Sequence, residues 1–387
     1  MDRERRLPKG NNEYHACRIN GHLFALVRAS LWQTPVDPQP FISCTPDWDA
    51  IGTLATRHTI AILTIESAIN VSPPVLPPSK EWLQKACSYS LRNLRTHSLL
   101  DTCVAEAIAL LQSEGLTPVL LKGQAYAHYY SRPELRQCGD IDLYVGEEAY
   151  RHICETVHRL GWDSQKQFFP TEKHYGCYLH GVHIELHRIA ARLPLPGANR
   201  RFQAWSRCQL SSSLRHINIG GKDIATPSPL FDVIFVFLHM YHHFINGGVG
   251  LRHLCDWVML LHAHKDDIDR LELQKQLRSF RLLRAWRIFT PIAVHYLGLP
   301  EMECPFYSAE YSRKSDRILA MILREGNFGR YAASTSKLPR SLMHRKFRSL
   351  LHYSHRSFIL FPFDPLTVTA YYCGYIYRGT KRVLKEM

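Results

Sequence analysis

Two aspartates that alternate with apolar residues constrain this sequence most, in the run from Asp140 to Val145. Side chains alternate between the two faces of a strand, so Asp140 and Asp142 project to one side and the apolar residues to the other. Neighbouring carboxylates repel one another unless a cation lies between them. Mg²⁺ takes such oxygen ligands together with substrate phosphates. The run therefore predicts a strand with a buried apolar face and a metal-binding face.

A glycine turn precedes this strand. Pro118 to Leu121 is an apolar run long enough for a buried strand, and Lys122-Gly123-Gln124 follows it, with a helix expected from Gln124 to Tyr130. A glycine turn after an apolar run, followed by alternating carboxylates, is typical of a metal-dependent phosphate site. The unit from residue 118 to residue 145 therefore points to phosphate chemistry.

A third carboxylate lies on a predicted hairpin, whose strands run from His174 to His180 and from Val182 to His187 on either side of Gly181. In the second strand His183, Glu185 and His187 share one face, opposite three apolar residues. If the apolar faces of this strand and of the aspartate strand both contact core helices, the polar faces align. We therefore expect three carboxylates and two histidines to line one groove.

The composition favours a folded protein that binds anions. With 387 residues the chain is long enough for two or three domains, and 45% hydrophobic and 21% charged residues argue against disorder. The net charge of +14 favours anionic partners such as nucleotides. No long run of Lys and Arg and no aromatic RNA-binding string is present, so long nucleic acid is not indicated.

The remaining bulk features favour the cytoplasm. Eleven cysteines without a CxxC pair fit a reducing compartment. The N-terminus is charged and lacks the apolar segment of a secretory signal, and no run approaches the roughly 20 apolar residues that a membrane span needs. The most apolar stretch, from Phe358 to Tyr377, is interrupted by Pro362, Asp364 and Pro365, which favours a buried helix over membrane contact.

Three stretches of the chain are distinguished by their patterns. Residues 1–98 are expected to be a helical segment, 99–192 an α/β core, and 193–387 a mainly helical domain that begins with a short hairpin ending near Gly221. The predicted helices cover residues 51–69 as a pair, 79–98, 100–114, 124–130 and 147–160, and continue from residue 228.

Four groups of residues resemble the bacterial family of uncharacterised nucleotidyltransferases: Leu121 to Gly123, Arg136, Asp140 to Leu143, and Ile184 to His187. This family is part of the superfamily that includes DNA polymerase beta and kanamycin nucleotidyltransferase. Downstream, the residues around His239 and His243 and the run Leu251 to Asp256 are similar too. The resemblance covers about residues 47–262. One departure is the turn, where the usual Gly-Ser or Gly-Gly is Gly123-Gln124.

The resemblance implies a fold, an activity and a set of roles. The fold would be α/β (α+β), with a mixed sheet and helical flanks. The activity would be transfer of a nucleoside monophosphate from an NTP, such as ATP, to a hydroxyl acceptor with release of pyrophosphate. The acceptor would be a sugar, a metabolite, a protein side chain or an RNA end. The implied ligands of Mg²⁺ or Mn²⁺ are Asp140, Asp142 and Glu185, and the implied phosphate-binding residues are Lys122, Gly123, Gln124 and Arg136.

Several alternatives stand beside these roles. Lys122 is equally suited to pair with a groove carboxylate, and Arg136 to neutralise one of the aspartates. His239 and His243 share a helix face at a metal-ligand spacing. The favoured alternative is that these histidines and Arg252 cap the groove or bind Asp256 across two packed helices. The cleft is expected to be lined by His187, His239, His243, Arg252 and Asp256.

Two other functions fit the same sequence. The first is a catalytically silent protein that keeps the fold and binds a nucleotide or a partner, which the Gly123-Gln124 turn favours. The second is a metallohydrolase centred on His239, His243 and Asp256. The complete set of Asp140, Asp142 and Glu185 favours nucleotidyl transfer over both.

Overall fold

The computed structural model describes residues 9–42, 44–162, 171–327 and 342–386. The helices are α1 (Lys9–Trp32), α2 (Gln39–Ile42), α3 (Trp48–Arg57), α4 (Ala61–Ala68), α5 (Lys80–Ser113), α6 (Gln124–Ala127), α7 (Gly146–Tyr150), α8 (Ile153–Arg159), α9 (Pro196–Ser212), α10 (Pro229–Asn246), α11 (Leu251–Ala263), α12 (Arg270–Ser279), α13 (Leu283–Pro291), α14 (Ser312–Glu325), α15 (Leu342–Leu360) and α16 (Pro365–Glu386). The strands are β1 (Val119–Leu120), β2 (Asp140–Tyr144), β3 (His174–Leu179), β4 (Val182–His187), β5 (Leu214–Ile219) and β6 (Lys222–Pro227). Short 3₁₀ turns cover Pro133–Leu135, Glu301–Glu303 and Ala309–Tyr311, and a π-helical turn covers Ile292–Tyr296.

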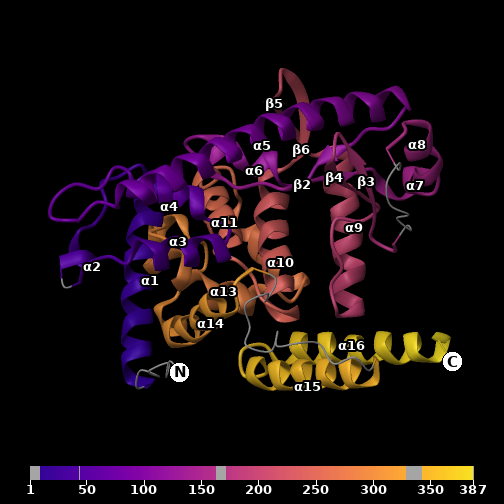
Figure 1. The fold of residues 1–387 in the computed structure, drawn as a ribbon. Helices are drawn as coiled ribbons and strands as arrows, with labels where there is room; N and C mark the ends of the chain where they lie inside the picture. Colours follow the sequence, from indigo (N-terminus) through magenta and orange to yellow (C-terminus); the bar gives the residue numbers. More distant parts are fainter. Residues whose placement is uncertain (1–8, 43, 163–170, 328–341, 387) are drawn as a thin grey trace.

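A mixed four-stranded sheet has the order β1-β2-β4-β3. β2 and β4 are parallel, while β1 and β3 pair antiparallel at the two edges. β5 and β6 form a second hairpin, but Gly221 lies in its turn and the hairpin continues to Pro227, beyond the expected end near Gly221. This arrangement confirms the predicted α/β (α+β) class, with helical segments on both sides of the sheet in the sequence (Figure 1).

A single long helix, α5, connects the N-terminal helices to the sheet. It runs along the top of Figure 1 and contacts α4 near one part of its length and β2 and β6 farther along. Ser79 caps its start by accepting a hydrogen bond from the Trp82 N–H, and Gly115 follows its end with φ of 79°. The two helices expected over 79–98 and 100–114 are therefore one. The predicted domain boundary at residue 98 lies inside α5, and the division into three stretches remains a prediction.

Two predicted helices are shorter than expected. After Gly123 only Gln124–Ala127 is α-helical, because Tyr129 and Tyr130 donate to carbonyls three residues back and tighten the chain into turns. The helix expected over 147–160 is divided into α7 and α8 by a similar turn at Arg151 and His152. The end of α6 at Ala127 lets Tyr130 turn inward toward α11, where its hydroxyl donates to Asp256.

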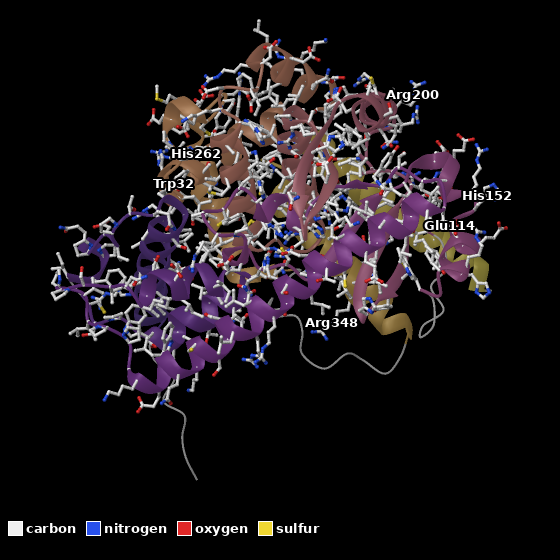
Figure 2. The ribbon with its side chains drawn as sticks, turned by 90° about the horizontal axis from the view of Figure 1, so that it is seen from above. Trp32, Glu114, His152, Arg200, His262 and Arg348 are labelled. Carbon is white, nitrogen blue, oxygen red and sulfur yellow. The ribbon has the colours of Figure 1, made fainter. Side chains whose placement is uncertain are left out.

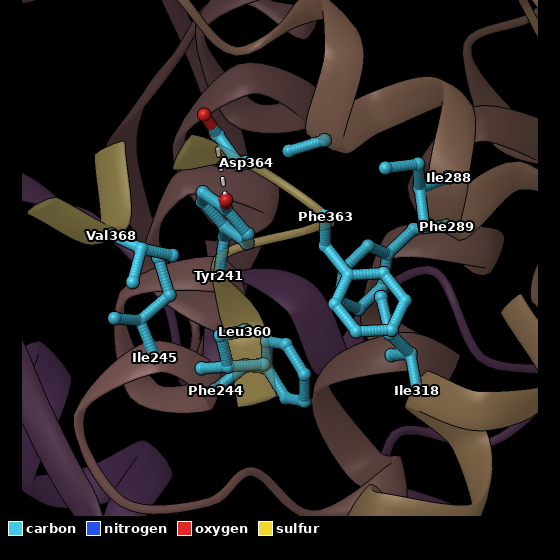
Figure 3. A pocket seen from close by; sticks show the side chains of 11 residues that line it. Tyr241, Phe244, Ile245, Ile288, Phe289, Ile318, Leu360, Phe363, Asp364 and Val368 are labelled. Carbon is cyan, nitrogen blue, oxygen red and sulfur yellow. Dashed lines mark hydrogen bonds between the residues drawn. The ribbon is translucent and has the colours of Figure 1, made fainter. Parts of the chain in front are cut away.

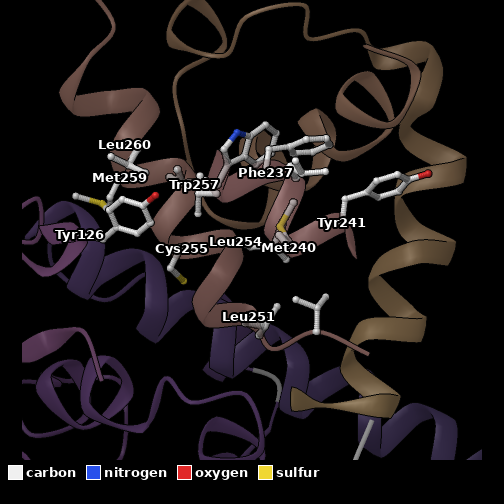
Figure 4. Close-up of a cluster of buried hydrophobic side chains, with 14 of the residues drawn as sticks. Tyr126, Phe237, Met240, Tyr241, Leu251, Leu254, Cys255, Trp257, Met259 and Leu260 are labelled. Atoms are coloured by element: carbon white, nitrogen blue, oxygen red, sulfur yellow. The ribbon is translucent and has the colours of Figure 1, made fainter. Parts of the chain in front are cut away.

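The core is built around α10 and α11. Ser228 caps α10 by accepting from the Phe231 N–H, as the Ser-Pro start predicts. Figure 4 shows Phe237, Trp257 and Tyr126 in this cluster, where α10, α11 and the turn after Gly123 meet. Trp257 is fully buried, as expected of a core tryptophan. This packing fixes α10 and α11 against the turn after Gly123.

The first helix, α1, and the last two, α15 and α16, pack against the same core. The Trp32 indole of α1 donates to the Leu297 carbonyl over 2.6 Å and lies edge-on to the His262 ring, and Figure 2 shows both side chains on one flank of the molecule. At the other end, α15 and α16 lie side by side at the bottom of Figure 1. No helix among the described residues has the length and apolar character needed to cross a membrane.

The C-terminal pair docks on α10 through polar contacts around an apolar gap. Arg356 donates to Glu325 over 2.6 Å and to the Ile245 carbonyl, while the Tyr241 hydroxyl donates to Asp364 over 2.8 Å (Figure 3). The gap beside Tyr241 and Phe363 has a volume of about 10 Å³. A water molecule needs about that much space, so this gap is a packing seam and not a ligand site.

We predict that Ile184→Ala lowers the free energy of unfolding by about 2–5 kcal/mol, because Ile184 is fully buried at the centre of β4. Urea denaturation would measure the change. Leu271→Ala is the matched control, since Leu271 is 79% exposed and should change stability by less than about 0.5 kcal/mol. Equal effects of the two substitutions would contradict this account of the core.

Candidate active site

Parallel pairing of β2 with β4 brings the three carboxylates to one place. In its register Asp140 is opposite His183, and Asp142 is opposite Glu185. Residues directly opposite in a ladder face the same side of the sheet. All three carboxylates lie at the wall of a cavity of about 220 Å³. The cavity is lined by Lys122, Gly123, Tyr126, Arg136, Asp140, Asp142, Lys173, His174, Glu185, Phe235, Val236, His239, His243, Arg252, His253 and Asp256.

Asp142 is the most enclosed of the three carboxylates, with 1% of its side chain exposed. Its Oδ1 lies 2.9 Å from Lys122 Nζ and 2.8 Å from His187 Nε2. Burial by itself would raise the pKa of Asp142, but Lys122 and His187 outweigh burial and hold that pKa well below its usual range. Burial likewise opposes the charge on Lys122, and Asp142 and Asp140 more than compensate, so its pKa is raised. Lys122 thus pairs with a groove carboxylate, one of its two expected roles.

Glu185 lies between two imidazoles. Its Oε2 is 3.2 Å from His187 Nε2 and 3.3 Å from His174 Nδ1. Burial raises the pKa of Glu185, but the contact with His187 reverses this, and the net shift is downward. His187 itself is fully buried and lies behind the carboxylates, outside the set of residues that line the cavity. His187 is expected from the sequence to line the cleft, but in the structure it lies beneath the cleft wall.

The glycine turn reaches the cavity through Lys122 and Gly123 but not through Gln124. Gly123 has φ of 67°, and a Cβ there would lie 3.2 Å from the Asp140 carbonyl, so the turn favours glycine. Gln124 is buried and turned away, with Nε2 3.2 Å from His97 Nδ1 and also hydrogen-bonded to Asp101 of α5. The Gln124 side chain therefore anchors the turn to α5 and does not face the cavity.

Arg136 binds a different carboxylate from those expected. Its Nε donates to Asp256 Oδ1 over 2.8 Å and its NH2 group to Oδ2 over 2.9 Å, and the Tyr130 hydroxyl also donates to Oδ1. Both charged side chains are almost fully buried. Arg252 does not bind Asp256 but donates to the Gln137 carbonyl over 2.6 Å. Asp256 thus joins α11 to the loop before β2.

Three histidines form the wall opposite the carboxylates. The ring centroids of His239 and His243 are 4.5 Å apart, and His253 lies 5.6 Å and 5.7 Å from them. Burial is the main cause of a lowered pKa in all three; the cation Lys122 adds to it in each, and Arg252 adds to it for His243 and His253. The pKa of His243 falls to about 3. These imidazoles are therefore neutral at ordinary pH.

The metallohydrolase arrangement is not assembled. Both oxygens of Asp256 are engaged by Arg136. Among the described residues, the His, Cys, Asp and Glu side chains whose ligand atoms converge are His174, Glu185 and His187. His239 and His243 share a helix face, as predicted, but they converge with no carboxylate in that way.

Sequence reasoning missed Lys173, His174 and His253. His174 is opposite His187 in the β3–β4 hairpin, so writing out the register around Gly181 would have found it. Lys173 precedes β3 and lines the cavity, where burial and the neighbouring Lys122 lower its pKa. His253 has no local signal, because only the packing of α11 on α10 brings it to the site.

The comparisons with known proteins agree with the resemblance. The model of a family described as uncharacterised nucleotidyltransferase matches residues 45–298. No curated protein matches the chain. Among solved structures, the chain is similar to the crystal structure of an antigenic nucleotidyltransferase-like protein from Paracoccidioides brasiliensis, at 16% identity over 55% of this chain and 96% of that chain, with a TM-score of 0.33.

We predict that Asp256→Asn lowers the free energy of unfolding by about 3–5 kcal/mol, because it leaves Arg136 buried without a counter-charge. The double variant Arg136→Met/Asp256→Asn should lose less than the sum of the two single variants. Urea denaturation of the four proteins gives the coupling. If Arg136 served only to bind phosphate, Arg136→Met would keep wild-type stability.

We predict that stability falls on acidification and that His243 contributes to this fall. The unfolded chain takes up the His243 proton near pH 6.5, whereas the folded protein resists it until about pH 3, so protonation favours unfolding between these values. His243→Gln should flatten the pH dependence by at most about 1.4 kcal/mol per pH unit. Urea denaturation at about pH 7 and about pH 5 tests this. The exposed His128→Gln is the control, and the same flattening in both variants would contradict the prediction.

Proposed function

Because the chain belongs to the uncharacterised nucleotidyltransferase family, we propose that it transfers a nucleoside monophosphate from an NTP to a hydroxyl-bearing acceptor and releases pyrophosphate. The observation that carries the proposal is the register of β2 and β4, which gathers Asp140, Asp142 and Glu185 at one wall of a cavity. We propose ATP as the first NTP to test.

The donor set fits a divalent cation. Asp140, Asp142 and Glu185 offer carboxylate oxygens from adjacent strands, which is the ligand type that Mg²⁺ and Mn²⁺ take. Asp142 is kept ionised by Lys122 and His187, so it is ready to act as a ligand. A bound divalent ion would supply charge neutralisation to the phosphates and polarise the transferring group. We assign its ligands to these three residues.

The other residues of the cavity support binding of a triphosphate. Lys122 and Lys173 place two cations next to the carboxylate wall, and Arg252 adds a third from α11. Lysine and arginine side chains bind phosphate oxygens through their positive charge and their N–H donors. Gly123 allows the backbone to approach the phosphates because no Cβ intervenes. The Arg136 guanidinium already binds both oxygens of Asp256, so Arg136 helps to hold the cavity in place and is not assigned to phosphate binding.

Glu185 is placed to take a proton from the acceptor hydroxyl. It lines the cavity, and a proton that it accepts can be shared with His187 at 3.2 Å. The neutral histidines of the opposite wall supply hydrogen-bond donors and acceptors to the base or to the acceptor. We further propose a cytoplasmic site of action, supported by ten cysteines that are all free among those described.

The main rival is a protein that binds nucleotide without turnover. It is favoured by Gln124, which replaces the usual small residue of the turn and points into α5. In that case no side chain that follows Gly123 in the turn would contact a phosphate. The two functions differ in one observable, the appearance of a labelled product.

We predict that purified protein with an α-³²P-labelled NTP, Mg²⁺ or Mn²⁺ and a cell extract moves label to an acceptor. Asp140→Asn and Asp142→Asn should each reduce turnover by about two orders of magnitude or more, because each removes a charged metal ligand. The control is Asp223→Asn, an exposed aspartate on β6. Circular dichroism should show that the variants remain folded.

Each outcome of this assay bears on the proposal. Label transfer in the wild type and in Asp223→Asn alone supports it, and the labelled product gives the acceptor class. Measurable NTP binding without transfer favours the binding protein. Unchanged turnover in Asp142→Asn would refute the proposed roles.

A further inference from the structure

We propose that His174, Glu185 and His187 form a nitrogen-rich metal centre that binds a divalent first-row transition ion, such as Fe²⁺ or Zn²⁺, in preference to Mg²⁺. The inference rests on the proposed function for the role of Glu185, and it names the ion for that part of the site. Its residues come from two strands of one hairpin, β3 and β4.

The hairpin register brings the two imidazoles together. His174 is directly opposite His187, and their ring centroids are 5.2 Å apart. Glu185 precedes His187 by two residues, so its side chain emerges on the same face. The ligand atoms of the three side chains all lie within 4.8 Å of one another. Backbone pairing of two strands, and not a flexible loop, therefore builds the cluster.

The distances between donor atoms fit ligands of a single ion. Two ligand atoms about 2.1 Å from an ion, at tetrahedral or octahedral angles, are roughly 3–3.4 Å apart. Glu185 Oε2 is 3.3 Å from His174 Nδ1 and 3.2 Å from His187 Nε2. Asp142 Oδ1 lies 2.8 Å from the same His187 nitrogen and offers a fourth donor from β2. A small inward adjustment would bring these atoms to one ion.

Two imidazole nitrogens of the cluster, His174 Nδ1 and His187 Nδ1, lack a hydrogen-bond partner among the described residues. His174 Nδ1 is buried, and although Glu185 Oε2 is within ion-pair distance, the geometry is not that of a hydrogen bond. His187 is fully buried beside two carboxylates. A buried polar atom without a hydrogen bond costs free energy. A metal ion would bind His174 Nδ1 and the carboxylates of Asp142 and Glu185 at once.

Ligand chemistry selects the class of ion. Mg²⁺ prefers oxygen ligands and keeps its waters, whereas imidazole suits Fe²⁺, Zn²⁺ and their neighbours in the first transition row. Two imidazoles at Glu185 therefore favour a transition ion at this position. Asp140 is not part of this cluster. It is left to an oxygen-rich position that suits Mg²⁺.

The competing explanation is a purely structural cluster, in which one protonated histidine holds Asp142 and Glu185 in place. It predicts no contact between either imidazole and an ion.

The test uses metal-free full-length protein and Mn²⁺ as the probe, without nucleotide. Titration followed by the electron paramagnetic resonance of free Mn²⁺ gives the affinity, and pulsed resonance detects ¹⁴N coupled to the bound ion. We expect ¹⁴N coupling in the wild type and displacement of Mn²⁺ only by a large excess of Mg²⁺. His174→Ala should weaken Mn²⁺ binding about tenfold or more, as loss of a ligand or its support does.

Matched variants keep the test decisive. His174→Gln on β3 is the milder ligand loss and serves in case His174→Ala does not fold, since His174 is 28% exposed. The control is His180→Asn, since His180 lies on the same hairpin, is exposed, and has φ of 50°, which asparagine tolerates. Bound Mn²⁺ without ¹⁴N coupling, or equal Mn²⁺ affinity in His174→Ala and the wild type, would overturn the proposal.

Failure of this inference and failure of the proposed function are distinguishable. Loss of ¹⁴N coupling together with normal label transfer removes the nitrogen-rich centre and leaves the transferase. Nitrogen-coupled Mn²⁺ without label transfer removes the transferase and leaves the metal centre.

Discussion

The parallel pairing of β2 with β4 is the constraint on which the site depends. Its register sets Asp142 opposite Glu185 and so places carboxylates from two separate parts of the chain on one face. A shift of one residue would turn Glu185 into the core and Ile184 toward the cavity. Burial of Ile184 on the other face opposes that shift, because exposing it costs apolar stabilisation. The apolar face therefore fixes the geometry of the polar one.

A second layer of buried polar contacts holds the loops that lead into this sheet. Asp256 binds Arg136 through both oxygens, and Tyr130 donates to the same carboxylate. Such a pair contributes little net stability, but a lost partner is costly, so its main effect is to specify one arrangement. It ties α11 to the residues just before β2. The cavity wall made of α10 and α11 is thereby held at a defined position relative to the carboxylates.

Local sequence patterns predicted the strands and the carboxylates of the site. Contacts between residues far apart in the sequence determined the partners of Arg136 and Gln124. The period-two alternation gave β2 and β4, and Gly181 gave the hairpin between β3 and β4. Arg136 meets Asp256 across 120 residues of sequence, and no pattern near either residue indicates that partner. Gln124 likewise turns toward α5 because His97 and Asp101 lie there, once α5 continues past residue 98.

The charges of the cavity explain why metal and nucleotide should bind together. Four basic and four acidic side chains line it, while its histidines are held neutral by burial. A cavity without excess positive charge has little attraction for a triphosphate, which carries several negative charges. A divalent ion bound to the carboxylates gives the cavity an excess of positive charge. Its attraction for the triphosphate is strong because the dielectric constant is lower there than in water. Nucleotide affinity should therefore depend on the ion more steeply than on any single lysine, since Lys122 is already largely neutralised by Asp142.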